Sequence, residues 1–259
     1  MSLAKLQDLT GRVALVTGGS RGLGLQMAEV LGELGAKVAI TARKKHELDA
    51  ATTQLEALGI EAFPFVCDMG DLAAIPGMVE EVIAKLGPID ILVNNAGTSW
   101  GSPTIDHPLD GWQKVMTLNV TAIFVVTQEV GRRCMVPRRQ GKVINIASIQ
   151  GLTGTYPEGM PTLAYNASKG AVVNMTRTLA AEWAPLGINV NAIAPGYFPT
   201  KMTAPIAAAL GGDKTAGMAP MNRVGGPEDL KGVTALFASD ACGFITGQTL
   251  AVDGGLTAI

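Results

Sequence analysis

Seven short apolar runs recur along the chain, and segments with a helical spacing of apolar residues separate them. The runs cover residues 12–18, 36–42, 60–68, 89–95, 141–148, 188–195 and 248–255. After the first run, apolar residues recur every three or four positions, at Leu23, Met27, Val30, Leu31 and Leu34. That spacing is typical of an amphipathic helix, and runs that are apolar throughout are typical of strands buried on both faces.

This alternation of strands and helices predicts an α/β fold. We expect a single Rossmann-like domain over residues 1–259, with a doubly wound sheet of seven parallel strands flanked by helices on both faces. Pro64 lacks a backbone N–H, so the third strand is expected at an edge of the sheet. Residues 201–222 are rich in Ala and Met and are broken by Gly and Pro, which predicts a substrate lid at about residues 199–225.

The composition narrows the class of protein. Hydrophobic residues make up 47% and charged residues 16% of the chain, which indicates a compact protein. The formal net charge of −2 provides no basic field for nucleic acid or anionic lipid. No apolar run reaches membrane-spanning length, and the N-terminus shows no secretory signal, so a cytoplasmic location is expected.

Arginine, cysteine and histidine residues suggest no further site. Four arginines between residues 132 and 139 follow an apolar helical stretch, so a helix C-terminus and the loop beyond it are favoured over nucleic-acid binding. Cys67, Cys134 and Cys242 have neither a metal nor a disulfide spacing and are expected to be reduced and buried. The two histidines lie in polar surroundings, so we expect no metal site and no histidine-based triad.

A glycine-rich stretch, "TGGSRGLG" at residues 17–24, lies between the first run and the helix that follows it. In that context Gly18 permits a tight turn, Gly22 lets the backbone approach a pyrophosphate, and Gly24 lets helix and strand pack closely. The helix N-terminus adds free N–H groups and a positive dipole end. The stretch predicts a dinucleotide site; the alternative is a turn needed only for packing.

The residues at the end of the second strand indicate which dinucleotide the protein binds. Proteins that select NAD usually carry an acidic residue there, but the sequence reads "TARKK" and no acid appears before Glu47. Arg43 stands at this point, and Arg21 lies inside the glycine loop. Two guanidinium groups can bind a 2′-phosphate, so NADP(H) is favoured as the cofactor. The alternative is that Arg43 simply begins a solvated helix.

The stretch "AYNASKG" places Tyr165 four residues before Lys169, so on a helix their side chains share a face. The pair could be an ordinary surface contact, or a phenol whose acidity is set by the ammonium. At about 4 Å and an effective dielectric near 20, the ammonium would favour the phenolate by about 4 kcal/mol, or roughly three pKa units. Desolvation opposes this effect. We expect Lys169 to lower the pKa of Tyr165, which makes the phenol a proton donor at neutral pH.

These features resemble the short-chain dehydrogenase/reductase family over essentially the whole chain. Besides the glycine loop, the shared motifs are "NNAG" at 94–97, "LNV" around residue 119, "INIAS" ending at 148, "YNASK" at 165–169, "PGYFPT" at 195–200 and "GQTLAVDGG" near the C-terminus. The resemblance implies that Tyr165 is the general acid/base and that Ser148 hydrogen-bonds the substrate carbonyl. It also implies that Lys169 holds the nicotinamide ribose and that Asn119 helps to hold a water in a proton relay.

The same resemblance implies where the cofactor lies. Asp68 and Met69 would lie against the adenine, residues 95–97 along the adenosine ribose, and Gly196 and Thr200 at the nicotinamide end. The residues expected at the cofactor are Gly18, Ser20, Arg21, Gly22, Leu23, Gly24, Arg43, Asp68, Met69, Asn95, Ala96, Gly97, Tyr165, Lys169, Pro195, Gly196, Phe198 and Thr200.

The sequence says less about the substrate than about the cofactor. Ser148 and Tyr165 lie seventeen positions apart, a few more than is usual in the family, so the extra residues are expected to form a loop over the site. Trp100, Tyr156 and Met160, with the lid methionines, suggest a partly apolar pocket. The resemblance favours NADPH-dependent 3-oxoacyl reductases, including the rhamnolipid-associated type; gluconate 5-dehydrogenase-like enzymes and a catalytically silent NADP(H) sensor are alternatives. It also implies a homotetramer or homodimer.

Overall fold

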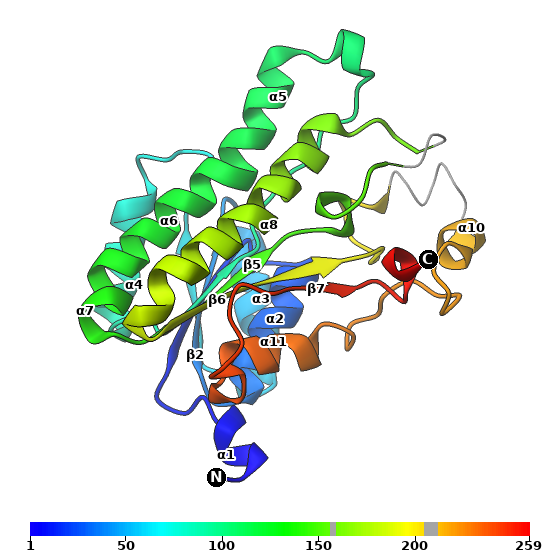
Figure 1. Cartoon of the computed structure of the whole chain (residues 1–259). Helices are drawn as coiled ribbons and strands as arrows, with labels where there is room; N and C mark the ends of the chain where they lie inside the picture. Colours follow the sequence, from blue (N-terminus) through cyan, green and yellow to red (C-terminus); the bar gives the residue numbers. More distant parts are fainter. Residues whose placement is uncertain (156–158, 205–211) are drawn as a thin grey trace.

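The computed structural model describes residues 1–155, 159–204 and 212–259 and contains one seven-stranded parallel sheet (Figure 1). The strand order is β3-β2-β1-β4-β5-β6-β7, so the predicted fold class is confirmed. β3 lies at an edge, as Pro64 indicated. The strands are β1 (Val13–Thr17), β2 (Lys37–Ala42), β3 (Ala62–Val66), β4 (Ile91–Asn94), β5 (Gly141–Ile146), β6 (Ile188–Pro195) and β7 (Thr249–Val252).

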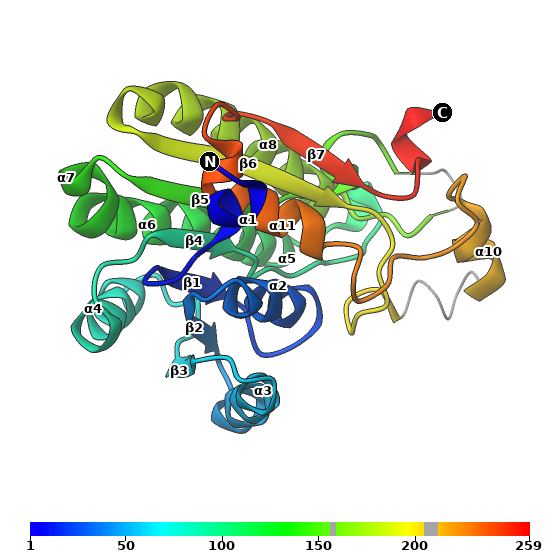
Figure 2. The same cartoon turned by 90° about the horizontal axis from the view of Figure 1, so that it is seen from below.

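Helices cover both faces of the sheet, and Figure 2 shows α2 and α3 on the opposite side from α4 and α6. Alternate residues of β1 separate the two cores: Ala14 and Val16 pack with α2, α3 and α11, whereas Val13 and Leu15 pack with α4, α6 and α8. The strands are therefore buried on both faces, which explains why their sequences are apolar throughout. The helices are α2 (Gly22–Glu33), α3 (Lys45–Ala57), α4 (Ile75–Leu86), α6 (Ala122–Val130), α8 (Leu163–Trp183) and α11 (Lys231–Ala238).

The long helical stretch between β4 and β5 contains two π-helical segments. It runs through α5 (Leu109–Met116), η2 (Thr117–Thr121), α6, η3 (Gly131–Met135) and α7 (Val136–Arg138). Its basic cluster lies at the C-terminal end and is paired with acids: Arg133 Nε donates to Glu129 at 2.9 Å, and Arg138 Nη1 donates to Asp90 at 2.8 Å. The predicted location of these arginines at a helix end is confirmed.

Short elements complete the described chain. They are α1 (Leu3–Gln7), η1 (Thr104–Asp106), η4 (Ile149–Gly151), η5 (Ala184–Leu186), α10 (Gly212–Gly217), η6 (Asp240–Cys242) and η7 (Leu256–Ala258). The helix α11 begins at Lys231, directly after a turn in which the Asp229 carboxylate accepts from the Gly226 N–H at 2.6 Å and from Arg223 at 2.8 Å. Among the described residues, none of the helices combines the length and apolar character needed to cross a membrane.

The three cysteines are free and buried, as expected. Burial raises the pKa of the Cys67 thiol to about 11, and nearby carboxylates act in the same direction. Such thiols stay protonated at neutral pH and contribute to packing rather than to nucleophilic chemistry.

Candidate active site

The four residues expected to be catalytic come from three elements beside the carboxyl ends of β4 and β5. Ser148 follows β5, Asn119 lies in η2, and Tyr165 and Lys169 lie in the first two turns of α8. Asn119, Lys169 and Ser148 are buried, with 0%, 4% and 8% of their surface exposed, and Tyr165 is half-buried. Ser148 lies close enough to Tyr165 to act on the pKa of its phenol, so the longer connection between them has not displaced Ser148.

Lys169 and Tyr165 face the same compartment. Lys169 Nζ lies 5.5 Å from the centroid of the Tyr165 ring and donates to the Ile146 carbonyl at 2.7 Å. The loop after β4 closes the other side, because a Cβ on Gly97 would lie 3.8 Å from Lys169 Nζ and 3.2 Å from Asn119 Oδ1. The ammonium is thus held by the end of β5 on the side of α8 that carries the phenol.

Asn119 connects the loop after β4 to α8. Its Oδ1 accepts from the Thr98 N–H at 2.8 Å, and its Nδ2 donates to the Thr98 carbonyl at 2.9 Å and to Ser168 Oγ at 3.0 Å. Ser168 Oγ in turn donates to the Tyr165 carbonyl at 2.7 Å. Both amide donors are therefore used within the protein, and the part of Asn119 in a water relay stays a prediction.

The ionisation of the pair differs from the expectation. Desolvation by burial raises the pKa of Tyr165 above its usual value of 10.0, and the hydrogen bond with Ser148 only partly opposes this. Burial also lowers the pKa of Lys169 from 10.5 to about 8. The prediction that Lys169 lowers the pKa of Tyr165 is wrong for the protein by itself, because burial disfavours the charged form of both groups and the ammonium is hydrogen-bonded to a backbone carbonyl.

The glycine loop has the geometry that its three glycines predicted. Gly18 and Gly22 have positive φ values of 66° and 55°, and a Cβ on Gly24 would lie 2.3 Å from the Gly18 carbonyl oxygen. Asn95 Nδ2 donates to the carbonyls of Thr17 and Gly18, both at 3.0 Å. The loop therefore brings the N-terminus of α2 against residues 95–97, where a phosphate could be bound by backbone N–H groups.

The segment after β6, which is expected at the nicotinamide end of the cofactor, packs against the glycine loop. A Cβ on Gly22 would lie 3.6 Å from Thr200 Cγ2, and the Gly196 N–H donates to the Val252 carbonyl at 2.9 Å. Thr200 thus lies against the loop, whereas Pro195 and Gly196 lie against β7, and Ser20 and Leu23 are half-buried within the loop. Phe198 is different: it is buried in the core, and Gly225 packs on its ring, so its side chain serves the fold.

At the adenosine end, Arg43 is exposed at the end of β2, and Arg21 precedes α2 with half of its side chain exposed. Asp68 Oδ1 accepts from the Gly70 N–H at 2.9 Å and shapes the turn after β3. Met69 is buried in the core, so only its backbone can face a nucleotide. That Asp68 and Met69 lie against the adenine stays a prediction.

Two of the three expected substrate residues can be located. A Cβ on Gly101 would lie 2.7 Å from Met160 Sδ, and the Ser102 N–H donates to the Pro161 carbonyl at 2.9 Å, so these two segments lie side by side. Trp100 packs on Gly111 of α5, with Lys114 Nζ 5.5 Å from its ring. Tyr156 lies outside the described residues. The structure thus places an apolar wall between α5 and the segment before α8.

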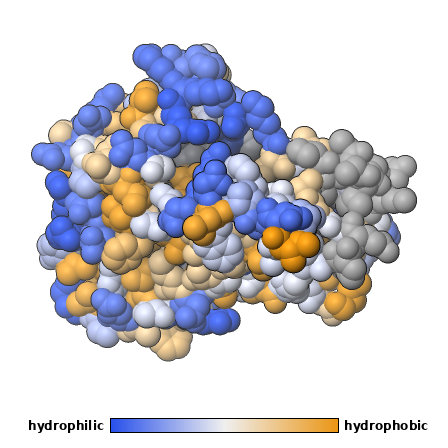
Figure 3. All heavy atoms as spheres, turned by 90° about the horizontal axis from the view of Figure 1, so that it is seen from above, coloured by the Kyte–Doolittle hydropathy of each residue, from blue (hydrophilic) through white to orange (hydrophobic). Residues whose placement is uncertain are grey.

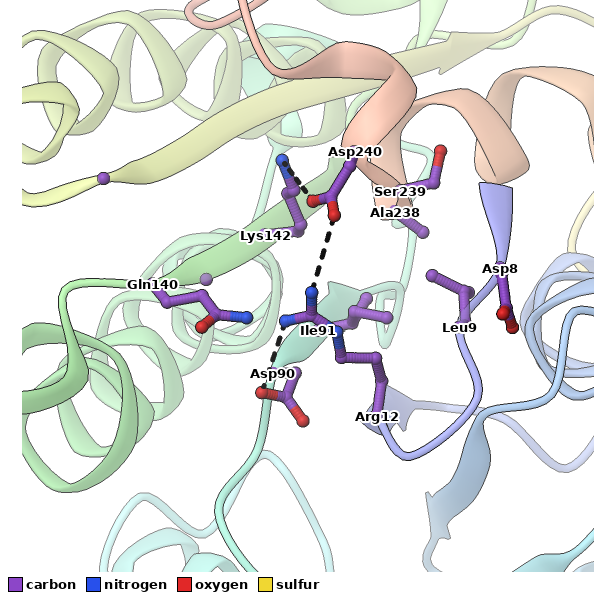
Figure 4. A pocket seen from close by; sticks show the side chains of 12 residues that line it. Asp8, Leu9, Arg12, Asp90, Ile91, Gln140, Lys142, Ala238, Ser239 and Asp240 are labelled. Carbon is purple, nitrogen blue, oxygen red and sulfur yellow. Dashed lines mark ion pairs between the residues drawn. The ribbon is translucent and has the colours of Figure 1, made fainter. Parts of the chain in front are cut away.

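A cavity of about 300 Å³ lies elsewhere, near the amino ends of β4 and β5 (Figure 4). It is polar, and Arg12 lies in it 3.6 Å from Asp240 and 3.9 Å from Asp90. Asp240 is also paired with Lys142, so most of the charges that line this cavity are balanced by a neighbour. A smaller cavity of about 160 Å³, lined by Tyr197, Asp253 and residues after α10, lies at the carboxyl edge, on the side of the candidate site.

Sequence reasoning missed three partners of the site. Thr98 and the Ile146 carbonyl act through backbone atoms, for which residue type gives no signal. Ser168 lies inside "YNASK" and could have been found, since it is three residues after Tyr165 on the same helix. It links Asn119 to the backbone of the tyrosine.

The known proteins that this chain resembles match it over nearly its whole length. The family model described as Enoyl-(Acyl carrier protein) reductase matches residues 18–257. The chain is 40% identical to a gluconate 5-dehydrogenase of Gluconobacter oxydans over 99% of both chains. It is also 40% identical to a rhamnolipids biosynthesis 3-oxoacyl-[acyl-carrier-protein] reductase of Pseudomonas aeruginosa, over 96% of this chain and 97% of that protein. A crystal structure of a gluconate 5-dehydrogenase from Burkholderia cenocepacia, in complex with NADP and tartrate, superposes with a TM-score of 0.92 at 36% identity over 100% of both chains.

Proposed function

Because the chain belongs to the short-chain dehydrogenase/reductase family, we propose that it is an NADP(H)-dependent oxidoreductase that interconverts a ketone and a secondary alcohol. The observation that carries this proposal is the convergence of Ser148, Tyr165 and Lys169 at the carboxyl edge of the sheet, beside a glycine loop built for a phosphate. Ligands of open parallel sheets bind at this edge.

The residues fit a phosphorylated dinucleotide. A Cβ on Gly24 would collide with the Gly18 carbonyl, so glycine is needed there for close packing, whereas a Cβ on Gly22 would meet only Thr200 within 4 Å, which leaves the backbone at the helix N-terminus open to a ligand. Arg43 forms no ion pair within the parts of the chain that the structure describes, which leaves its guanidinium free for a 2′-phosphate. When bound, NADPH would supply the hydride that reduces the carbonyl carbon.

The chain's own residues would supply position and a proton. The Ser148 hydroxyl would hydrogen-bond the substrate oxygen, and the neighbouring Tyr165 hydroxyl would give that oxygen its proton. Burial raises the pKa of Tyr165 in the protein alone, which keeps the phenol protonated and ready to donate. Lys169, held by the Ile146 carbonyl, would hold the nicotinamide ribose next to the phenol.

For the substrate we propose a 3-oxoacyl compound. The apolar wall formed by Trp100 and Met160 supports this class, as does the likeness to the Pseudomonas reductase. Gluconate-type substrates are the second candidate, because a Gluconobacter relative and a Burkholderia structure carry that name. Loss of NADPH absorbance should be followed with 3-oxoacyl thioesters, 5-ketogluconate and aryl ketones, with the Tyr165→Phe variant as the control in each case.

Turnover of any of these ketones by the native protein, and none by Tyr165→Phe, would support an enzyme. A catalytically silent NADP(H) sensor would bind NADPH and give no turnover in either protein. Turnover of 5-ketogluconate but not of 3-oxoacyl thioesters would replace the first substrate class by the second.

We also propose that residues 1–259 form one domain that assembles as a homotetramer in the cytoplasm. Figure 3 shows apolar side chains gathered in several patches on one face. Leu109, Phe124 and Leu163 are exposed apolar residues on α5, α6 and α8, and Phe244 and Leu250 are exposed near the edge strand β7. Such faces favour assembly. Light scattering that gives the mass of a single chain would contradict the assembly.

A further inference from the structure

The carboxylate of Glu47 lies among the cations expected to recognise the cofactor. Glu47 is in the first turn of α3, and its Oε1 accepts from Arg21 Nη1 at 2.9 Å and lies 3.5 Å from Lys44 Nζ. Its side chain is only 20% exposed, whereas those of Arg21 and Lys44 are about half exposed. The acid is therefore the most enclosed member of the group.

The charges around Glu47 keep it ionised. Burial raises the pKa of its carboxyl, but the positive charges of Arg21, Lys44 and Lys201 outweigh burial and hold the pKa below its usual value. Lys201 follows Thr200, so the group joins the glycine loop, the start of α3 and the segment after β6. At neutral pH one carboxylate thus partly neutralises three cations.

We propose that Glu47 is a specificity-determining residue that competes with the 2′-phosphate of the dinucleotide for Arg21. This inference rests on the proposed NADP(H) function. A phosphate held by Arg21 and Arg43 would carry close to two negative charges, and it would meet the Glu47 carboxylate on the same guanidinium. Bound NADP(H) must therefore replace the Glu47 contact or be repelled by it. A dinucleotide without the 2′-phosphate leaves the ion pair intact.

The consequence is a weaker preference for the phosphorylated cofactor than Arg21 and Arg43 would give alone. Glu47→Gln keeps the shape and an acceptor oxygen but removes the charge. Exposed ion pairs contribute little, so the expected gain in affinity is modest, about two- to five-fold. The gain should shrink as salt is added, because these charges lie near the surface.

The test is a calorimetric titration with two probes that lack the nicotinamide, 2′,5′-ADP and 5′-AMP. Glu47→Gln should bind 2′,5′-ADP about two- to five-fold more tightly than the native protein and 5′-AMP equally well. Asp49→Asn is the matched control: it makes the same charge change on the same helix, but Asp49 pairs with Lys45 at 2.8 Å. In an Arg21→Gln background the effect of Glu47→Gln should disappear.

The outcomes separate this inference from the function on which it rests. Unchanged or weaker binding of 2′,5′-ADP by Glu47→Gln, in a protein that prefers 2′,5′-ADP over 5′-AMP, would overturn the role of Glu47 alone. An equal gain in Asp49→Asn would also overturn it, since overall charge would then explain the effect. A native protein that binds the two probes equally would overturn the NADP(H) assignment itself.

Discussion

Replacing Lys169 by methionine tests how strongly burial acts on the ammonium of this site. The residue is 4% exposed, and burial lowers its pKa from 10.5 to about 8. At neutral pH the folded protein therefore holds a charge that the unfolded chain would hydrate. By linkage, a shift of this size corresponds to about 3 kcal/mol of lost stability at neutral pH.

Methionine resembles lysine in length but carries no charge, so Lys169→Met removes this cost. It also removes the hydrogen bond from Nζ to the Ile146 carbonyl at 2.7 Å. Losing that bond costs about 1 to 2 kcal/mol. We therefore expect the variant to be more stable than the native protein at pH 7 by about 1 to 2 kcal/mol, although its turnover is lost.

The pH dependence has a definite sign. The cost is fully present below about pH 8, where the folded and the unfolded chain are both protonated. It is lost as the pH rises from about 8 toward 10.5, because the folded protein releases its proton first. The advantage of Lys169→Met should shrink over this range and then reverse, since only the missing hydrogen bond remains.

Urea unfolding at pH 7 and at pH 10, at one protein concentration, measures these free energies. Lys45→Met is the control, because it makes the same substitution on a side chain that is 75% exposed. Its effect should be small at both pH values. A Lys169→Met variant that is less stable than the native protein at pH 7, or a difference that does not change with pH, would refute the reasoning.

Three further variants test the site. Tyr165→Phe should abolish ketone reduction and leave NADPH binding intact in a fluorescence titration; native turnover would remove the tyrosine from the mechanism. Arg43→Asp should raise the KM for NADPH about tenfold or more and that for NADH much less, and equal changes would discard the 2′-phosphate contact. Gly24→Ala should lower stability by about 1 to 3 kcal/mol and weaken NADPH binding, because its Cβ would lie 2.3 Å from the Gly18 carbonyl oxygen. Gly77→Ala, which meets nothing within 4 Å, is its control, and like behaviour of the two in melting curves would contradict the packing argument.

The features that depend on local order were predictable from the sequence. The continuous apolar strands predicted a sheet that is covered on both faces. Pro64 predicted that its strand lies at the edge, because proline has no N–H to donate to a second neighbouring strand. The spacing of Tyr165 and Lys169 placed both on one face of α8, and the structure brings them together with Ser148.

The features that depend on burial were not predictable. The pKa of Tyr165 moves opposite to the expected direction because desolvation by burial outweighs the opposing effect of Ser148, and no sequence pattern measures desolvation. Met69 and Phe198 lie in cofactor motifs, yet their side chains pack in the cores. The pairing of Glu47 with Arg21 joins the first turn of α3 to the glycine loop through long side chains, whose directions spacing alone does not fix.

The π-helical segment η2 makes the direction of the Asn119 side chain depend on the length of this part of the chain. A π-helical segment carries one residue more than the α-helix it interrupts, and it often arises at functional sites. Deleting one residue from Thr117–Thr121 would restore regular winding and leave the flanking helices in register, but it would change the directions of the side chains inside the segment. Asn119 and the core-facing side chains of α6 could then not both keep their directions. Evolution of this helix should therefore tolerate substitutions far better than length changes, and an in-frame indel here would separate a folded scaffold from a working one.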